Sequence, residues 1–472
     1  MVTQNNPWRY VRSVRGIASL AIAWLFIAAF STGPAQAMKI QKVVSPKGIE
    51  AWLVEDHTLP LIAMQFGFRG GCAQDITGKA GLAYFVSGMM NEGAGDIKSQ
   101  EFQEKLESLA IGMSFDASRD TMVGSLKTLT KNKDEAFRLL RLALSEPRMD
   151  PDAVERVRGQ IASIIKVEQE DPGHIASEAW FKMAFKGHPY AQSTKGTLET
   201  VAKITPDDLK TYVKNIFARD GLVVAVVGDV TADELGKSLD EVFGALPAKQ
   251  KLQPIPEVTW QAEGESQVIP LKAPQSVVTF GQPGLKRHDK DFFAAYILNY
   301  IIGGGGFASR LMEEVREKRG LAYSVYTYLY TLDHAGIMLG GVATKNKAVK
   351  QSIEIIKQEL TRIAAEGPTS EELDNAKRYL TGSYALRFSS STRIAGVLLG
   401  IQLENLGIDY IDRRVGIIEA VKLEDIKRVA KEVIKPGKLI ITVVGQPEGL
   451  ESSRSSEETK AAPKPASKAK GG

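Results

Sequence analysis

The same order of hydrophobic and polar positions occurs once in each half of the chain. Residues 209–217 and 426–434 space their apolar side chains as one face of a helix does. The first segment is followed by the β-branched run Leu-Val-Val-Ala-Val-Val-Gly, which ends at Gly228. The second is followed by Leu-Ile-Ile-Thr-Val-Val-Gly, which ends at Gly445. The pattern predicts that one helix–strand unit occurs twice.

Elsewhere the pattern alternates long helices with short strands. Helical spacing covers residues 134–144 and 349–366, and strand-like runs occupy residues 49–54 and 277–280. Such alternation predicts α+β domains in which helices pack on a mainly antiparallel sheet.

A repeated hexapeptide gives a second indication of duplication. Residues 79–84 read Lys-Ala-Gly-Leu-Ala-Tyr, and residues 318–323 read Lys-Arg-Gly-Leu-Ala-Tyr. A match this short can arise by chance, so it supports a duplication without establishing one.

A polar stretch with three prolines, residues 247–263, divides the chain near its middle and suits an extended linker. It separates an N-terminal domain at 38–246 from a C-terminal domain at 264–446. Residues 447–472 are rich in Ser, Glu, Lys, Ala and Pro and nearly lack large apolar side chains, so they predict a disordered tail.

The first 37 residues have the layout of a secretory signal peptide. Arg9, Arg12 and Arg15 precede an apolar run at 17–30, and the small-residue site Ala-Gln-Ala ends at Ala37. The run is shorter than the roughly 20 residues of a membrane span, although an uncleaved anchor is the alternative. We expect cleavage near Ala37, no stable membrane span afterwards, and export to the bacterial periplasm.

Charge and composition exclude several classes of protein. Hydrophobic residues make up 43% of the 472 positions and charged residues 25%, which is ordinary globular usage. The net charge of +4 comes from the two ends, and residues 38–446 are neutral with no basic stripe. Nucleic acid is therefore not an expected partner.

Cysteine and histidine usage excludes the common metal motifs. Cys72 is the single cysteine, so no intramolecular disulfide or cysteine-based zinc cluster can form, and a small core residue is expected. No two of the five histidines lie within one helical turn of each other. The glycine run at 303–306, before a predicted helix at 307–318, lacks the rest of a phosphate-binding motif and is expected to be a flexible or closely packed connection.

Residues 81–93 read Gly-Leu-Ala-Tyr-Phe-Val-Ser-Gly-Met-Met-Asn-Glu-Gly. This segment resembles the signature of the M16 metallopeptidases, the family of pitrilysin, insulin-degrading enzyme and the mitochondrial processing peptidase. There an inverted His-x-x-Glu-His supplies two zinc ligands and the general base from one helix. The resemblance places Tyr84 at the first His, Ser87 at the Glu and Gly88 at the second His, and the family's third ligand falls at Ile164. It therefore implies a degenerate site with no metal in this chain.

The second half is similar to another segment of the family, the one that polarises the substrate. In that segment an Arg and a Tyr seven residues apart face the scissile peptide, and the match falls on Arg316 and Tyr323. A guanidinium and a phenol O–H can both donate to the oxygen that gains charge when a peptide carbonyl is attacked. Without the resemblance, the pair would be interpreted as a helix-end Arg and a Tyr packed in a sheet.

The resemblance spans residues 40–446 and implies two homologous M16-type (LuxS/processing-peptidase-like) domains. It implies a non-catalytic subunit of a periplasmic two-subunit zinc peptidase, in which Arg316 and Tyr323 act in trans. The partner would be a catalytic M16 subunit that carries His-x-x-Glu-His and the zinc, and the pair would form a heterodimer that takes peptide substrates. A structural or peptide-binding M16-fold protein with no role in hydrolysis is the alternative, and catalysis by other residues of this chain is a third.

Overall fold

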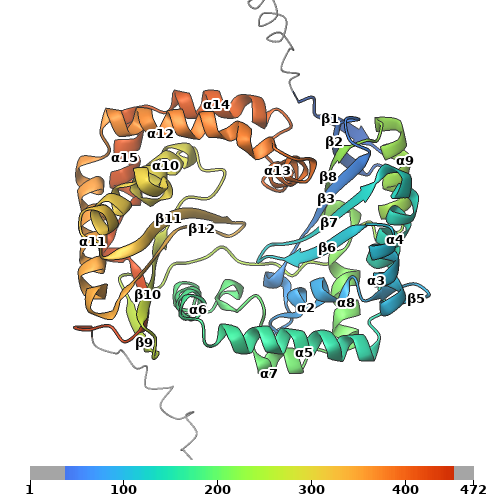
Figure 1. Cartoon of the computed structure of the whole chain (residues 1–472), viewed down its shortest axis with the longest axis horizontal. Coiled ribbons are helices and arrows are strands. Elements are labelled where there is room, and N and C mark those ends of the chain that lie inside the picture. The colour runs from blue at the N-terminus through green and yellow to red at the C-terminus, as the bar shows by residue number, and fades with distance from the viewer. Residues whose placement is uncertain (1–37, 451–472) are drawn as a thin grey trace, which may run out of the picture. The chain divides into compact units, whose positions relative to one another are not determined.

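The computed structural model of the chain describes residues 38–450 (Figure 1). The predicted signal peptide at 1–37 lies outside the described residues, as do residues 451–472 of the predicted tail. Within 38–450, no helix combines the length and the apolar character needed to cross a membrane.

The first half is built on a six-stranded sheet with the order β1-β2-β8-β3-β7-β6. Neighbouring strands are antiparallel except for β2 and β8, which are parallel. The strands are β1 (Gln41–Val44), β2 (Glu50–Glu55), β3 (Leu61–Arg69), β6 (Gly112–Ala117), β7 (Thr121–Leu129) and β8 (Leu222–Gly228), with a separate pair β4 (Gly93–Ala94) and β5 (Ile97–Lys98). The helices are α2 (Leu82–Met89), α3 (Ser99–Ser108), α4 (Lys133–Ser145), α5 (Pro151–Glu168), α6 (Pro172–Ala184), α7 (Leu198–Ala202), α8 (Pro206–Ile216) and α9 (Ala232–Phe243).

The second half is built on a five-stranded sheet with the order β11-β12-β10-β13-β9, in which only β13 and β9 are parallel. Its strands are β9 (Ser266–Pro270), β10 (Gln275–Pro283), β11 (Ala322–Leu332), β12 (Ala335–Lys345) and β13 (Ile440–Gly445). Its helices are α10 (Phe292–Asn299), α11 (Val349–Glu366), α12 (Ser370–Gly382), α13 (Ser391–Leu403), α14 (Tyr410–Ala420) and α15 (Leu423–Val433). The predicted α+β class with mainly antiparallel sheets is confirmed.

The two sheets repeat one plan. The order β2-β8-β3-β7-β6 of the first corresponds to β9-β13-β10-β12-β11 of the second, including the single parallel pair. Phe66 on β3 pairs with Gly124 on β7, and Phe280 on β10 pairs with Gly340 on β12. In both pairs the ring occupies the space where a glycine Cβ would stand, 2.1 Å and 2.5 Å from the nearest ring atom. The predicted duplication is therefore confirmed.

Most predicted elements appear with shifted ends. The helices predicted at 209–217, 426–434, 134–144 and 349–366 are α8, α15, α4 and α11. The strand predicted at 49–54 overlaps β2, and the strand predicted at 277–280 lies within β10. The repeated hexapeptide does not reflect the duplication, because residues 79–84 lead into α2 whereas residues 318–323 lead into β11.

The helix predicted at 307–318 is shorter and irregular. Gly306 has a φ of +56°, and the Ser309 hydroxyl donates to its carbonyl oxygen at 2.7 Å, so a tight turn precedes the helix. The segment Met312–Glu317 then has π-helical geometry. Gly303 packs closely, since a Cβ there would lie 2.6 Å from the Thr327 hydroxyl on β11.

Each sheet is partly covered by a helix from the other half (Figure 1). Helix α13 lies on β3 and β8, and helix α6 lies on β10 and β13. A Cβ at Gly281 on β10 would lie 2.6 Å from Trp180 of α6, whose indole N–H donates to the Ile440 carbonyl at 3.1 Å. At the equivalent Gly67 on β3, a Cβ would contact Leu399 of α13 at 3.6 Å.

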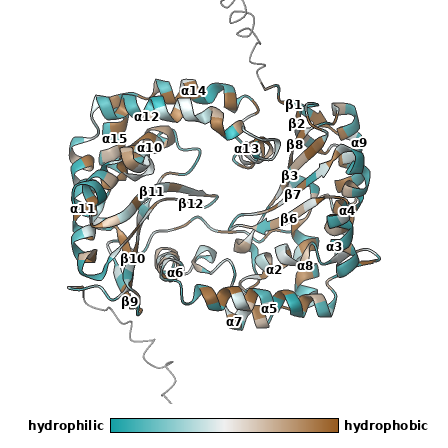
Figure 2. Cartoon of the chain, in the orientation of Figure 1, coloured by the Kyte–Doolittle hydropathy of each residue, from teal (hydrophilic) through white to brown (hydrophobic). Residues whose placement is uncertain are grey.

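Hydrophobic and hydrophilic residues are distributed unevenly between the strands and the outer helices. In Figure 2, strands β2 and β8 are largely hydrophobic, whereas α11 carries many hydrophilic residues. Cys72 lies in the core of the first half, as predicted, and burial raises the pKa of its thiol well above the ordinary value. Residues 250–265, within and just beyond the predicted linker, form neither helix nor strand. The start of this segment is anchored to the first half, because the Gln250 amide donates to the Arg69 carbonyl at 2.7 Å.

Candidate functional site

Helix α2 carries three of the four positions of the predicted degenerate metal site. Its start is fixed by Asp75, whose carboxylate accepts the backbone N–H groups of Gly81 at 2.7 Å, Leu82 at 3.2 Å and Ala83 at 2.8 Å. Burial raises the pKa of Asp75 to about 7, although these three donors oppose the shift. Gly81 has a φ of +93°, and a Cβ there would lie 2.4 Å from the Lys195 carbonyl oxygen.

None of the three positions on α2 presents a metal ligand. Tyr84 is half-buried, and the Lys195 ammonium lies 5.7 Å from the centre of its ring. Ser87 is buried, and its hydroxyl donates to the Tyr84 carbonyl within the same helix at 2.7 Å. Gly88 has no side chain, and a Cβ there would meet Val157 of α5 at 3.1 Å.

Helix α5 carries the fourth position, Ile164, an apolar side chain that is 38% exposed. At the end of the same helix, Glu168 accepts from the Lys195 ammonium at 2.5 Å, and the His174 ring nitrogen lies 3.6 Å from its other oxygen. Lys195 therefore connects α2 with α5. Sequence reasoning missed Lys195, since an isolated lysine before a short helix gives no signal.

Zinc, the metal implied by the resemblance, does not fit these residues. Over residues 38–450, no three His, Cys, Asp or Glu side chains are close enough to share a metal ion. The ammonium of Lys195 also adds a positive charge beside Tyr84, and a like charge disfavours a cation.

The structure brings Arg316 and Tyr323 together. The guanidinium carbon of Arg316 lies 4.7 Å from the centre of the Tyr323 ring and 4.5 Å from that of Phe307. Tyr323 is 81% exposed and Phe307 is 67% exposed, whereas the Arg316 side chain is mostly covered. The contact of Arg316 with Phe307 was not predicted, because Phe307 was expected to be part of a regular helix at 307–318.

The end of the π-helical segment and the bend after it place the pair. Glu314 is buried and accepts from Lys318 at 2.7 Å and from Arg319 at 2.6 Å, which fixes the last turn. These two cations hold the pKa of Glu314 below its usual value. Gly320 has a φ of +60°, and its N–H donates to the Arg316 carbonyl at 2.8 Å, so the chain turns back into β11.

Strand β11, which carries Tyr323, exposes two further tyrosines. It is an edge strand of its sheet and exposes Tyr326 at 50% and Tyr328 at 41%, with their rings stacked 6.2 Å apart. Exposed tyrosines offer apolar contact through their rings and hydrogen bonding through their hydroxyls, as surfaces that bind peptides do.

Two family models match the chain. Residues 54–198 match the family model described as insulinase (peptidase family M16), and residues 203–380 match the model described as the peptidase M16 inactive domain.

Some relatives of this chain are named as proteases and others as non-peptidase homologs. The non-peptidase homolog YmxG of Helicobacter pylori is 30% identical over 364 residues, which cover 77% of this chain and 84% of that protein. An uncharacterized zinc protease of Streptomyces coelicolor is 25% identical over 429 residues, 88% of this chain and 91% of that protein. A solved structure described as a peptidase M16 inactive domain from Pseudomonas fluorescens has a TM-score of 0.82 and 27% identity, and the match covers 88% of this chain and 100% of that one.

Proposed function

The chain belongs to peptidase family M16, and we propose that it is the non-catalytic subunit of a two-chain zinc peptidase in the bacterial periplasm. In this proposal a separate M16 subunit brings His-x-x-Glu-His and the zinc. The present chain binds the peptide and supplies hydrogen-bond donors to the carbonyl that is attacked.

The observation that carries the proposal is the contact between Arg316 and Tyr323 in a chain whose own metal-site positions hold no ligand. Loss of the ligands removes water activation from this chain, whereas the pair can still donate to an oxygen that gains negative charge. The exposure of Tyr323 leaves its ring accessible to a bound peptide. The layout of residues 1–37 supports export.

A peptide-binding protein with no part in hydrolysis is the second candidate. The observation in its favour is that the Arg316 guanidinium contacts the Phe307 and Tyr323 rings and lies 3.3 Å from the Glu317 carboxylate. These contacts by themselves would suit an arginine that holds an aromatic surface together.

Co-expression separates the two candidates. The chain is produced with an M16 partner that carries His-x-x-Glu-His, and the purified material is assayed for stoichiometry, zinc content and peptide cleavage. We expect a stable heterodimer that holds one zinc and cleaves peptides. The pure chain should neither hold stoichiometric zinc nor cleave peptides. Stoichiometric zinc and cleavage by the pure chain would contradict the proposal. A stable complex whose cleavage is indifferent to Arg316→Ala would favour the second candidate.

A further inference from the structure

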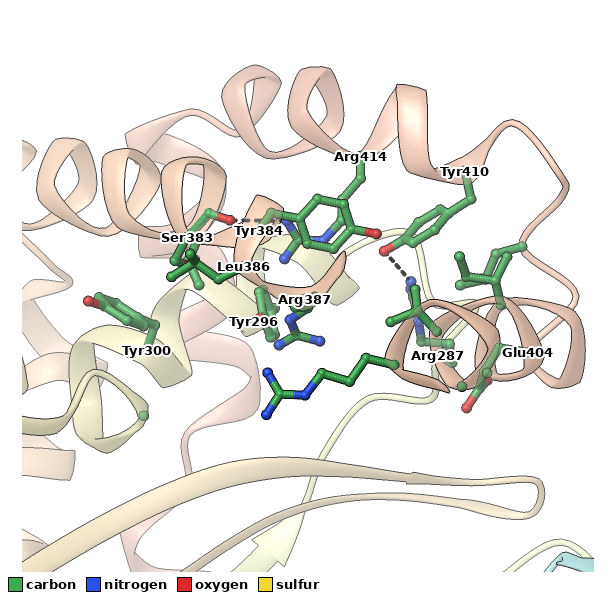
Figure 3. A pocket seen from close by; sticks show the side chains of 18 of the residues that line it. Arg287, Tyr296, Tyr300, Ser383, Tyr384, Leu386, Arg387, Glu404, Tyr410 and Arg414 are labelled. Carbon is green, nitrogen blue, oxygen red and sulfur yellow. Dashed lines mark hydrogen bonds between the residues drawn. The ribbon is translucent and has the colours of Figure 1, made fainter. Parts of the chain in front are cut away.

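A pocket of about 900 Å³ lies among helices α10, α12, α13 and α14 of the second half (Figure 3). Four arginines and five tyrosines line it, and Glu404 is its single carboxylate. The arginines are Arg287, Arg387, Arg393 and Arg414. The lining is therefore strongly positive and rich in phenol hydroxyls.

The four guanidiniums lack carboxylate partners. Within residues 38–450, none of them has a carboxylate oxygen inside the 4.0 Å ion-pair distance, in contrast to Arg310, which lies 2.6 Å from Glu372. Arg414 is only 5% exposed, yet its guanidinium contacts the Tyr384 and Tyr296 rings, 4.1 Å and 5.9 Å from their centres, and donates one hydrogen bond to the Leu380 carbonyl at 3.0 Å. A buried guanidinium without a counter-charge favours binding of an anion, because burial of an unpaired charge is costly.

Arg287 is held in place by neutral groups. It donates to the Tyr410 hydroxyl at 2.9 Å and stacks on Phe292, with its guanidinium carbon 4.4 Å from the ring centre. These contacts orient the guanidinium without neutralising its charge, as the labelled Arg287 and Tyr410 in Figure 3 illustrate.

Glu404 does not cancel the charge of the pocket. In Figure 3 it lies at one end of the lining, and Tyr300 lies at the other. Its carboxylate accepts from the Thr331 hydroxyl at 3.3 Å, and one carboxylate among four guanidiniums leaves the lining net positive. Burial raises the pKa of Glu404 above the ordinary value, and the charge of Arg287 opposes that shift.

The wall formed by α13 leaves room for a ligand. Gly396 and Gly400 lie one helical turn apart, and a Cβ at either position would meet no atom within 4 Å. At the rim, Leu386 is 72% exposed and Tyr379 is 57% exposed, which provides apolar contact. One phosphate ion would leave most of such a space empty, whereas a peptide segment of a few residues would fill it.

We propose that this pocket binds an acidic segment of a peptide, with side-chain carboxylates on the four arginines and the peptide's apolar groups on the tyrosine rings. The inference rests on the proposed function, since it names the class of peptide that the chain selects. Guanidiniums suit this task because their planar fork matches a carboxylate.

The test uses the full-length mature chain and three fluorescein-labelled peptides of equal length, one with four Glu residues, one with Gln in their place and one with Lys. We expect the acidic peptide to bind at least about tenfold more tightly than the Gln peptide, and increasing salt to weaken this preference. Arg387 and Arg393 are exposed, and Arg387→Gln and Arg393→Gln should each weaken acidic-peptide binding roughly three- to tenfold. Arg393→Lys should weaken it less than Arg393→Gln does, because lysine keeps the charge but not the planar fork. Arg141→Gln, on α4 in the other half, is the control that should leave binding unchanged.

Equal affinity for the acidic and Gln peptides would overturn the inference. So would wild-type affinity for the acidic peptide in the double variant Arg387→Gln with Arg393→Gln. Saturable binding of tripolyphosphate without any binding of the acidic peptide would also overturn it, by assigning the pocket to a phosphorylated small molecule. The assay needs neither partner nor zinc, so its failure is distinct from failure of the peptidase proposal. A cleaving heterodimer with no preference for acidic peptides would refute the inference alone.

Discussion

The Lys195 ammonium lies 2.5 Å from the Glu168 carboxylate and 5.7 Å from the centre of the Tyr84 ring. One cation thus connects the two helices on which the family resemblance places the metal ligands. In this half, the contacts of one lysine with a glutamate and a tyrosine link the two helices.

The first prediction concerns the stability of this link. Lys195→Met should lower the free energy of unfolding by about 1 to 2 kcal/mol, because both side chains are about three-quarters covered and Glu168 would lose a charged donor. The measurement is urea unfolding followed by circular dichroism. Lys203→Met, which removes a more exposed pair with Glu199, is the control and should cost under about 0.5 kcal/mol. Equal costs for the two variants would contradict a specific role for Lys195.

The second prediction concerns repair of the metal site. Tyr84→His alone should recover neither zinc nor cleavage, and the triple change with Ser87→Glu and Gly88→His should still bind less than one zinc per chain after desalting. Ile164 offers no third ligand, and Val157 crowds position 88. Elemental analysis and a peptide assay provide the readout. Stoichiometric, tightly held zinc in the triple variant would mean that this region is closer to a working site than its side chains indicate.

The third prediction concerns the heterodimer. Arg316→Ala or Tyr323→Phe should lower the turnover of the complex roughly tenfold to a thousandfold, because each removes a donor to the developing oxyanion. Gel filtration should show both chains still associated. Arg138→Ala, which breaks an exposed pair with Glu135, is the control and should leave turnover unchanged. Unchanged turnover in both test variants would leave only the non-hydrolytic candidate.

The fourth prediction concerns pH. The pKa of Asp75 is raised from 3.8 to about 7, so the folded chain binds this proton more tightly than the unfolded chain does. The stabilisation from the protonated form is complete below about pH 4 and is lost as the pH rises to about 7. We therefore expect the difference in unfolding free energy between wild type and Asp75→Asn to fall with pH over this range and to level off above it. Urea unfolding at a series of pH values measures the difference, and a difference independent of pH would contradict the expectation.

The fifth prediction compares two equivalent glycines. Gly281→Ala should destabilise the chain by about 1 to 3 kcal/mol, since the added Cβ would lie 2.6 Å from Trp180 and 2.8 Å from Leu339. Gly67→Ala should change stability by less than about 1 kcal/mol, because its nearest neighbour would be 3.5 Å away, an ordinary contact. Thermal unfolding of both variants gives the comparison, and a larger loss for Gly67→Ala would reverse the packing argument.

The spacing of apolar residues in the sequence correctly located the helices and strands that bury one face along their whole length. Helix α11 begins and ends where its apolar spacing does, and the runs that end at Gly228 and Gly445 form β8 and β13. The π-helical turn around Arg316 could not be predicted, because it depends on Glu314 pairing with two nearby cations and on a glycine bend.

The candidate site was predictable only where a motif was local. Residues 81–93 and 316–323 could be matched to a family pattern, and the contact between Arg316 and Tyr323 follows from their seven-residue spacing and the bend at Gly320. The arginines and tyrosines of the pocket come from separate segments that only the tertiary fold brings together. No short-range pattern could have indicated that cluster.

The covering of each sheet by a helix from the other half has a consequence for the origin of the chain. Helices α6 and α13 occupy equivalent places in the two repeats, and each packs on the opposite sheet. A single repeat on its own would leave that face of its sheet open to water, unless a second copy supplied the missing helix. Joining two copies of the gene of a helix-swapped homodimer would produce a chain with this arrangement, and cutting the segment at 250–265 should leave two fragments that remain a folded pair.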